Sequence, residues 1–78
     1  MEFINKSDRK FEDISSEEYR KYRMLSGEWY KISNPQYMSV SKAGHYVVDD
    51  TGAVHYLKCK AWDVLVWKAK EGEPHIVW

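Results

Sequence analysis

A chain of 78 residues has room for one domain, and a domain of this size buries only about 60 to 65% of the surface that its unfolded state exposes. Its 12 lysines and arginines equal its 12 aspartates and glutamates, so there is no basic surplus to displace counterions from nucleic acid and no acidic surplus to imitate it. The single cysteine excludes an internal disulfide, and no apolar run approaches the roughly 20 residues of a membrane-spanning helix.

The first segment, residues 1–13, is polar and mixed in charge, with Phe3, Ile4 and Phe11 as its large apolar groups. Its opening, MEFINKSDRK, lacks the apolar stretch of a secretion signal, so we expect a cytoplasmic protein. The segment is expected to form either a flexible arm or an edge strand.

The next stretch, ISSEEYRKYRMLSG, favours a helix from about residue 16 to residue 25. Ser15 and Glu18 have the spacing of a capping box, in which each side chain bonds the other residue's backbone. Tyr19, Tyr22 and Leu25 recur at every third position and predict an apolar stripe on one face of that helix.

From residue 28 onward, side-chain character alternates with the period of two that is typical of β-strands. The pattern predicts strands over 28–33, 36–41, 45–50, 53–60 and 62–70, and a short strand or a tail over 75–78. The NP and DDTG turns predict two hairpins, and apolar groups on both faces of 62–70 predict a central strand.

These elements predict a single α+β domain over residues 1–78. One N-terminal helix would pack on a five- to six-stranded antiparallel sheet or a small half-open barrel.

Catalytic, metal and cofactor motifs are weak. If 53–60 is a strand, the Cα atoms of His55 and Cys59 lie about 13 Å apart, too far to share a zinc ion or to act as base and nucleophile. A two- or four-residue hairpin loop would put His45 and His55 on opposite faces, whereas a three-residue loop would put them on the same face. Asp49 and Asp50 have the composition of a turn. We therefore expect no enzyme, no metal and no cofactor.

Aromatic residues are the feature that points to function: six tyrosines, four tryptophans and two phenylalanines. Neighbours such as Trp29 and Tyr30 must face opposite sides of a sheet, so one helix cannot cover all the rings. Trp62 and Trp67 are expected in the core. The predicted partner-binding residues are exposed aromatics with nearby lysines: Tyr30, Tyr37, Tyr46, Tyr56, Trp78, Lys58 and Lys60.

The stretch VSKAGHYVVDDTGAVHYLKCKAWDVLVWKAKEGEP, with EEYRKYRMLSG before it, resembles a group of short open reading frames carried by tailed bacteriophages. The shared pattern is Gly-His, a Val-Val-Asp strand, an Asp-x-Gly turn, His-Tyr, a Trp-led strand and Gly-x-Pro, from which LKCKAW departs before Trp62. Such proteins have no established activity. The resemblance implies an accessory protein made inside a bacterial cell and assigns no functional residue.

Together these features predict a small non-enzymatic protein that binds a host bacterial protein and inhibits or modulates it, in host takeover or anti-defence. The alternative is binding of single-stranded nucleic acid by aromatics on a β-sheet, beside Lys31, Lys58, Lys60 and Lys68. The neutral charge ranks that alternative second. Unpaired sheet edges also allow a homodimer, and no membrane partner is expected.

Overall fold

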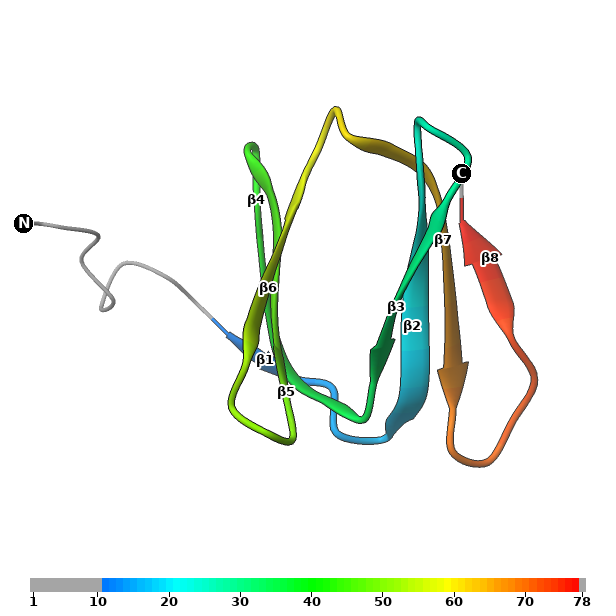
Figure 1. Ribbon diagram of the computed structural model, residues 1–78. Coiled ribbons are helices and arrows are strands. Elements are labelled where there is room, and N and C mark those ends of the chain that lie inside the picture. The colour runs from blue at the N-terminus through cyan, green and yellow to red at the C-terminus, as the bar shows by residue number, and fades with distance from the viewer. Residues whose placement is uncertain (1–10, 78) are drawn as a thin grey trace, which may run out of the picture.

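Two four-stranded antiparallel sheets make up the protein, as the computed structural model describes it for residues 11–77. The first sheet has the order β1-β4-β5-β6, formed by Glu12–Asp13, Pro35–Ser41, Gly44–Asp49 and Val54–Lys58. The second has the order β3-β2-β7-β8, formed by Trp29–Ser33, Glu17–Met24, Trp62–Ala69 and His75–Val77. The sheets face each other as two layers (Figure 1).

The fold is therefore all-β, and the expected α+β class with an N-terminal helix over 16–25 is wrong. That segment is β2, a central strand whose two edges pair with β3 and β7. Its side chains alternate: Arg20 and Tyr22 are buried between the sheets, while Tyr19 and Lys21 point outward. Backbone pairing on both sides outweighs the local helix propensity of this sequence.

The supposed helix cap belongs to a turn between β1 and β2. The Ser15 N–H donates to Oδ1 of Asp13 at 2.8 Å, and the Glu17 N–H donates to the Ile14 carbonyl at 3.0 Å. Small polar residues make the same local bonds in turns as at helix starts, so the capping-box spacing did not distinguish the two. Within the segment 1–13, Glu12–Asp13 forms an edge strand, and residues 1–10 lie outside the described part of the chain.

The predicted hairpin of 28–33 with 36–41 is also wrong, because β3 and β4 lie in different sheets. Asn34 between them has a left-handed φ of 52°, and its N–H donates to the Glu18 carbonyl at 2.9 Å. The NP sequence bends the chain from the second sheet into the first instead of reversing it. β3 and β4 therefore act as the two halves of one bent strand.

The DDTG hairpin is confirmed. β5 pairs with β6 from Gly44↔Lys58 to Val48↔Val54, and Gly52 takes a φ of 89° in the turn. The side chain of Asp49 closes the turn, because its Oδ1 accepts bonds from the N–H groups of Thr51 and Ala53. Because Val47 is opposite His55, both His45 and His55 point between the sheets, as the three-residue loop requires.

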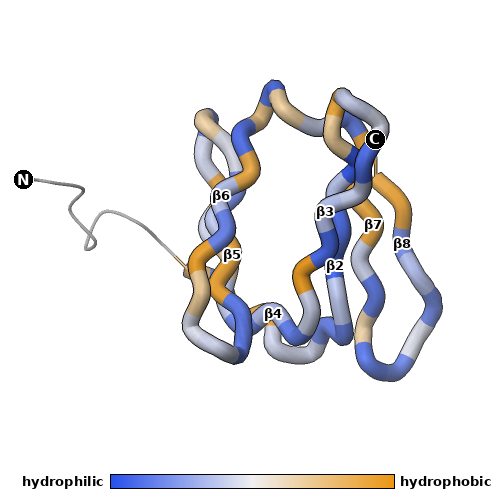
Figure 2. Tube along the Cα trace, in the orientation of Figure 1, coloured by the Kyte–Doolittle hydropathy of each residue, from blue (hydrophilic) through white to orange (hydrophobic). Residues whose placement is uncertain are grey.

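The core fills the space between the two layers. Its buried members come from both sheets and from the β1–β2 turn: Ile14, Tyr22, Ile32, Val47, Leu57 and Leu65. Trp62 and Trp67 pack against it, as expected, and β7 is a central strand. Figure 2 shows apolar segments on strands of both layers. Residues 11–77 contain no helix of the length and apolarity needed to cross a bilayer.

Candidate binding surfaces

One aromatic surface covers the outer face of the first sheet. Tyr46 on β5 is the register partner of Tyr56 on β6, and their rings stack with centroids 4.4 Å apart. Tyr37 on β4 projects from the same face, because it lies two residues from Ser39, the partner of Tyr46. We call this the tyrosine surface, and it comprises Tyr37, Tyr46, Val48, Val54, Tyr56 and Lys58.

Side chains of the tyrosine surface are exposed to solvent, and some of them are restricted in conformation. Tyr37 is 51% exposed, Tyr56 40% and Val54 61%. The Tyr56 hydroxyl donates to the Ala43 carbonyl at 3.2 Å, which together with the stacked Tyr46 ring restricts the Tyr56 side chain. Rings that are already ordered lose little conformational entropy when a partner binds.

The other predicted partner-binding residues lie elsewhere. Tyr30 is on β3 of the second sheet, and its hydroxyl is 2.7 Å from Nδ1 of His55, so it bridges the two layers at their rim. Lys60 follows β6 in the turn before β7, and Trp78 lies outside the described residues. The structure therefore brings together Tyr37, Tyr46, Tyr56 and Lys58 and separates Tyr30 from them.

The Tyr30–His55 bridge continues to the DDTG turn. Nε2 of His55 is 2.8 Å from Oδ2 of Asp49, and since a carboxylate only accepts, Nε2 donates in this bond. The Tyr30 hydroxyl is the partner of the other ring nitrogen, Nδ1. The bonds from His55 and then from Thr51 hold the pKa of the Asp49 carboxyl well below its usual range. The carboxylate is thus committed to the turn and not to acid–base chemistry.

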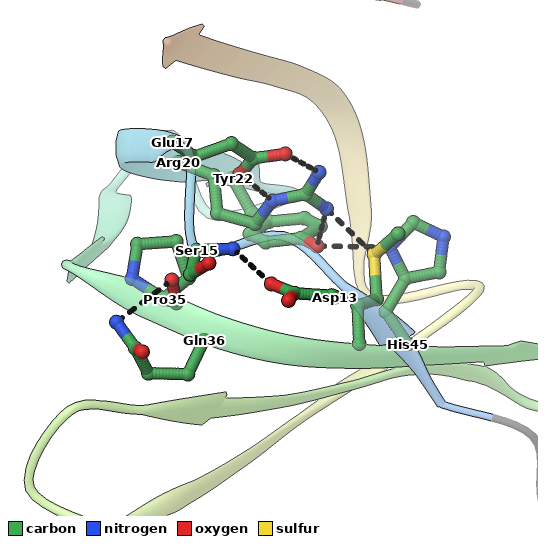
Figure 3. Close-up of polar contacts among 9 residues, drawn as sticks. Asp13, Ser15, Glu17, Arg20, Tyr22, Pro35, Gln36 and His45 are labelled. Atoms are coloured by element: carbon green, nitrogen blue, oxygen red, sulfur yellow. Dashed lines mark hydrogen bonds and ion pairs between the residues drawn. The ribbon is translucent and has the colours of Figure 1, made fainter. Parts of the chain in front are cut away.

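A second polar network lies deep between the sheets (Figure 3). The Arg20 guanidinium donates to both carboxylate oxygens of Glu17, at 2.8 and 2.9 Å, and to the Tyr22 hydroxyl at 2.9 Å. That hydroxyl is 2.8 Å from Nδ1 of His45. The chain of bonds runs from β2 of the second sheet to β5 of the first and holds the layers together.

Three members of this network are buried, and His45 at its end is half-buried. Arg20 is 3% exposed, Glu17 6% and Tyr22 0%. Burial raises the pKa of Tyr22, and burial followed by the charge of Arg20 lowers the pKa of His45. Trp62 packs edge-on against Tyr22, with ring centroids 4.9 Å apart. These contacts give the network a structural role.

A groove of about 660 Å³ lies on the outer face of the second sheet. The Arg23–Asp63 ion pair and Pro74 are part of its lining. The rest of the lining combines two rings, one ammonium group and an apolar floor: Tyr19, Lys21, Trp29, Val64, Val66 and Ile76. Lys31 stands beside it, with its Nζ 4.9 Å from the centre of the Tyr19 ring. We call these six residues and Lys31 the basic groove.

Sequence reasoning missed the basic groove because it assigned residues 16–25 to a helix. The signal that identifies it is the alternation of Tyr19, Lys21 and Arg23 with Arg20 and Tyr22, which places the first three on one face of a strand.

The candidate ligands His45, His55 and Cys59 lie within residues 11–77. In that range no three His, Cys, Asp or Glu side chains are grouped so that they could hold a metal ion. Cys59 is exposed as a free thiol.

Comparisons with protein-family models, with curated proteins and with solved structures find no match to this chain.

Proposed function

We propose that the protein is a small non-enzymatic binding protein that holds a partner protein against its tyrosine surface. The observation that carries the proposal is the convergence of Tyr37, Tyr46 and Tyr56, from three neighbouring strands, on one outer face. Tyrosines supply large contact areas with few rotatable bonds and are enriched among the residues that dominate binding energy.

The charges around the tyrosine surface favour a protein as the occupant. Lys58 lies at one end of it, and Asp13, the register partner of Tyr37, lies at another. Val48 and Val54 are register partners on the same face. An apolar, aromatic centre with charges at its rim is the arrangement of protein–protein interfaces.

The bacteriophage resemblance implies a protein made inside a bacterial cell. We therefore propose that the partner is a host bacterial protein in the cytoplasm and that binding inhibits or modulates it. A small domain without catalytic groups acts on such a target by covering part of it. The tyrosine surface is the region that would do so.

Affinity capture from bacterial lysate with mass spectrometry tests the proposal, using wild type and the Tyr37→Ala/Tyr56→Ala variant. We expect one host protein to be retained by wild type after nuclease treatment and lost from the variant. The matched control is Lys21→Gln/Lys31→Gln on the opposite face, which should retain the same protein. Equal capture by all three proteins would contradict the proposal.

Self-association is the competing use of the tyrosine surface. Sedimentation of the wild type at several concentrations distinguishes it: a dimer that the Tyr37→Ala/Tyr56→Ala variant abolishes would make a second copy of this chain the occupant.

A further inference from the structure

Two lysines lie side by side at the basic groove. Lys21 on β2 and Lys31 on β3 are register partners, so their side chains leave the sheet side by side on its outer face. Like charges directly opposite one another on neighbouring strands are destabilising. Lys21 and Lys31 therefore repel each other, and a bound anion would relieve that repulsion.

In the described part of the chain, no carboxylate forms an ion pair with either lysine. Lys21 Nζ lies 4.9 Å from the centre of the Trp29 ring and 6.0 Å from that of Tyr19, and Lys31 Nζ lies over Tyr19. Lys31 lowers the pKa of the Glu18 carboxyl, but less than Lys68 does.

These two lysines make the outer face of the second sheet locally positive, although the chain as a whole has no net charge. The face also carries Arg23 and Lys68, but these are paired with Asp63 at 2.9 Å and with Glu18 at 2.7 Å. The remaining positive charge belongs to the two lysines. The glutamates of the flanking turns, at positions 28 and 73, are exposed and make no ion pair with either lysine.

The groove also offers apolar surface on which the flat groups of a ligand can pack beside the two ammonium groups. The groove floor is Val64 and Val66, both less than a tenth exposed although they do not belong to the inter-sheet core, and Ile76 and Trp29 border it at 56% and 46% exposure. Its volume of about 660 Å³ lies in the range of ligand-binding pockets.

We propose that the basic groove binds single-stranded nucleic acid, as a site separate from the tyrosine surface. Backbone phosphates bind the ammonium groups of Lys21 and Lys31 and draw them from the rings, and bases then stack on Trp29 and Tyr19. An acidic peptide would satisfy the lysines but would leave the rings and the apolar floor without a flat partner. The site recognises backbone and stacking surface and has no preference for base sequence.

Fluorescence anisotropy of a short labelled oligodeoxythymidine, titrated with the full chain at several salt concentrations, tests this proposal. We expect binding at low salt that weakens as salt rises. The Lys21→Gln/Lys31→Gln variant should bind more weakly and lower the slope of log affinity against log salt by about 1.4, because each phosphate contact to a single strand contributes about 0.7. Trp29→Leu should weaken binding about tenfold without changing the slope.

The matched control is Lys42→Gln/Lys60→Gln, which removes the same charge from two exposed turns outside both surfaces. Its affinity and salt slope should equal those of the wild type. An equal loss in both double variants would mean attraction by net charge alone and would overturn the proposal, as would absence of binding at low salt.

Two further ligands separate the alternatives. An oligonucleotide without bases should bind more weakly than oligodeoxythymidine, and a polyglutamate peptide should not compete. If either ligand binds as well as oligodeoxythymidine, the groove recognises charge and not nucleic acid. Thermal unfolding checks the fold of each variant, and Lys21→Gln/Lys31→Gln should melt no lower than the wild type because it loses a repulsive pair. None of these outcomes depends on the tyrosine surface.

Discussion

Tyr22 is the residue on which the two layers depend most directly. It is fully buried, packs edge-on against Trp62, and its hydroxyl joins Arg20 of the second sheet to His45 of the first. The hydroxyl accepts from the Arg20 guanidinium and can donate its own proton to Nδ1 of His45. A bond in that direction requires that this nitrogen be unprotonated.

This requirement gives stability a pH dependence. Burial and then the Arg20 charge lower the pKa of His45 below its ordinary value of 6.5, so the folded protein takes up the proton less readily than the unfolded chain. The contribution of His45 is present above the unfolded pKa and is lost as pH falls through the folded pKa. We expect the melting temperature to fall from about pH 7 to about pH 5.

Thermal unfolding across this range, for wild type and His45→Gln, measures the effect. The amide that replaces the imidazole can still accept from Tyr22 but does not titrate, so the His45→Gln variant should lose part of the slope. His75→Gln, which changes an exposed histidine stacked on Trp67 at the edge of the second sheet, should keep it. Equal slopes in wild type and His45→Gln would show that other groups cause the pH dependence.

At the level of elements, the bend between β3 and β4 decides the architecture. Asn34 holds a φ of 52°, which permits the chain to leave the second sheet and enter the first without a reversal. Asparagine and glycine adopt this conformation readily, whereas residues with a plain Cβ are strained in it.

We therefore expect Asn34→Ala to lower the free energy of unfolding by about 1 kcal/mol and Asn34→Gly to preserve most of it. Urea denaturation of the three proteins measures both effects. Because glycine and alanine both remove the side-chain amide, equal losses in the two variants would assign the effect to that amide and not to the backbone.

The same bend explains what the sequence could and could not predict. The DDTG hairpin is local, and its Asp49 and Gly52 specify the turn directly, so it was predicted correctly. The division into two sheets depends on Asn34, where an NP pair is equally typical of a reversal. The strand β2 depends on partners up to about fifty residues away, such as Lys68 opposite Tyr19, and local propensity carries no information about them.

The residues of the two candidate surfaces could likewise be predicted only where their strands were recognised. Tyr37, Tyr46 and Tyr56 could be identified because their strands were recognised and alternation placed them. Tyr30 lies apart from them, since its position depends on which sheet β3 joins. The basic groove could not be foreseen once Lys21 had been assigned to a helix, because its position opposite Lys31 of the correctly expected strand then stayed hidden.

At the level of the whole molecule, the sheet edges and the sheet faces offer different kinds of contact. No described strand pairs with the outer edge of β3 or β6. Both strands carry lysines, Lys31 and Lys58, and lysine on an edge strand opposes pairing with another chain. The faces are therefore better suited to binding than the edges.

The tyrosine surface and the basic groove lie on the outer faces of opposite layers, with the core between them. Occupants of the two faces do not meet, so we expect a captured partner protein and an oligonucleotide to bind at the same time. Anisotropy of the labelled oligodeoxythymidine, repeated with the partner protein in saturating amount, should show unchanged affinity and a slower-tumbling ternary complex.

Each double variant should remove only one of the two ligands: Tyr37→Ala/Tyr56→Ala the protein, Lys21→Gln/Lys31→Gln the oligonucleotide. Competition between the ligands would contradict this independence, because the core separates the two faces. It would mean instead that both ligands use a single face. The double variant that loses both ligands would then identify that face.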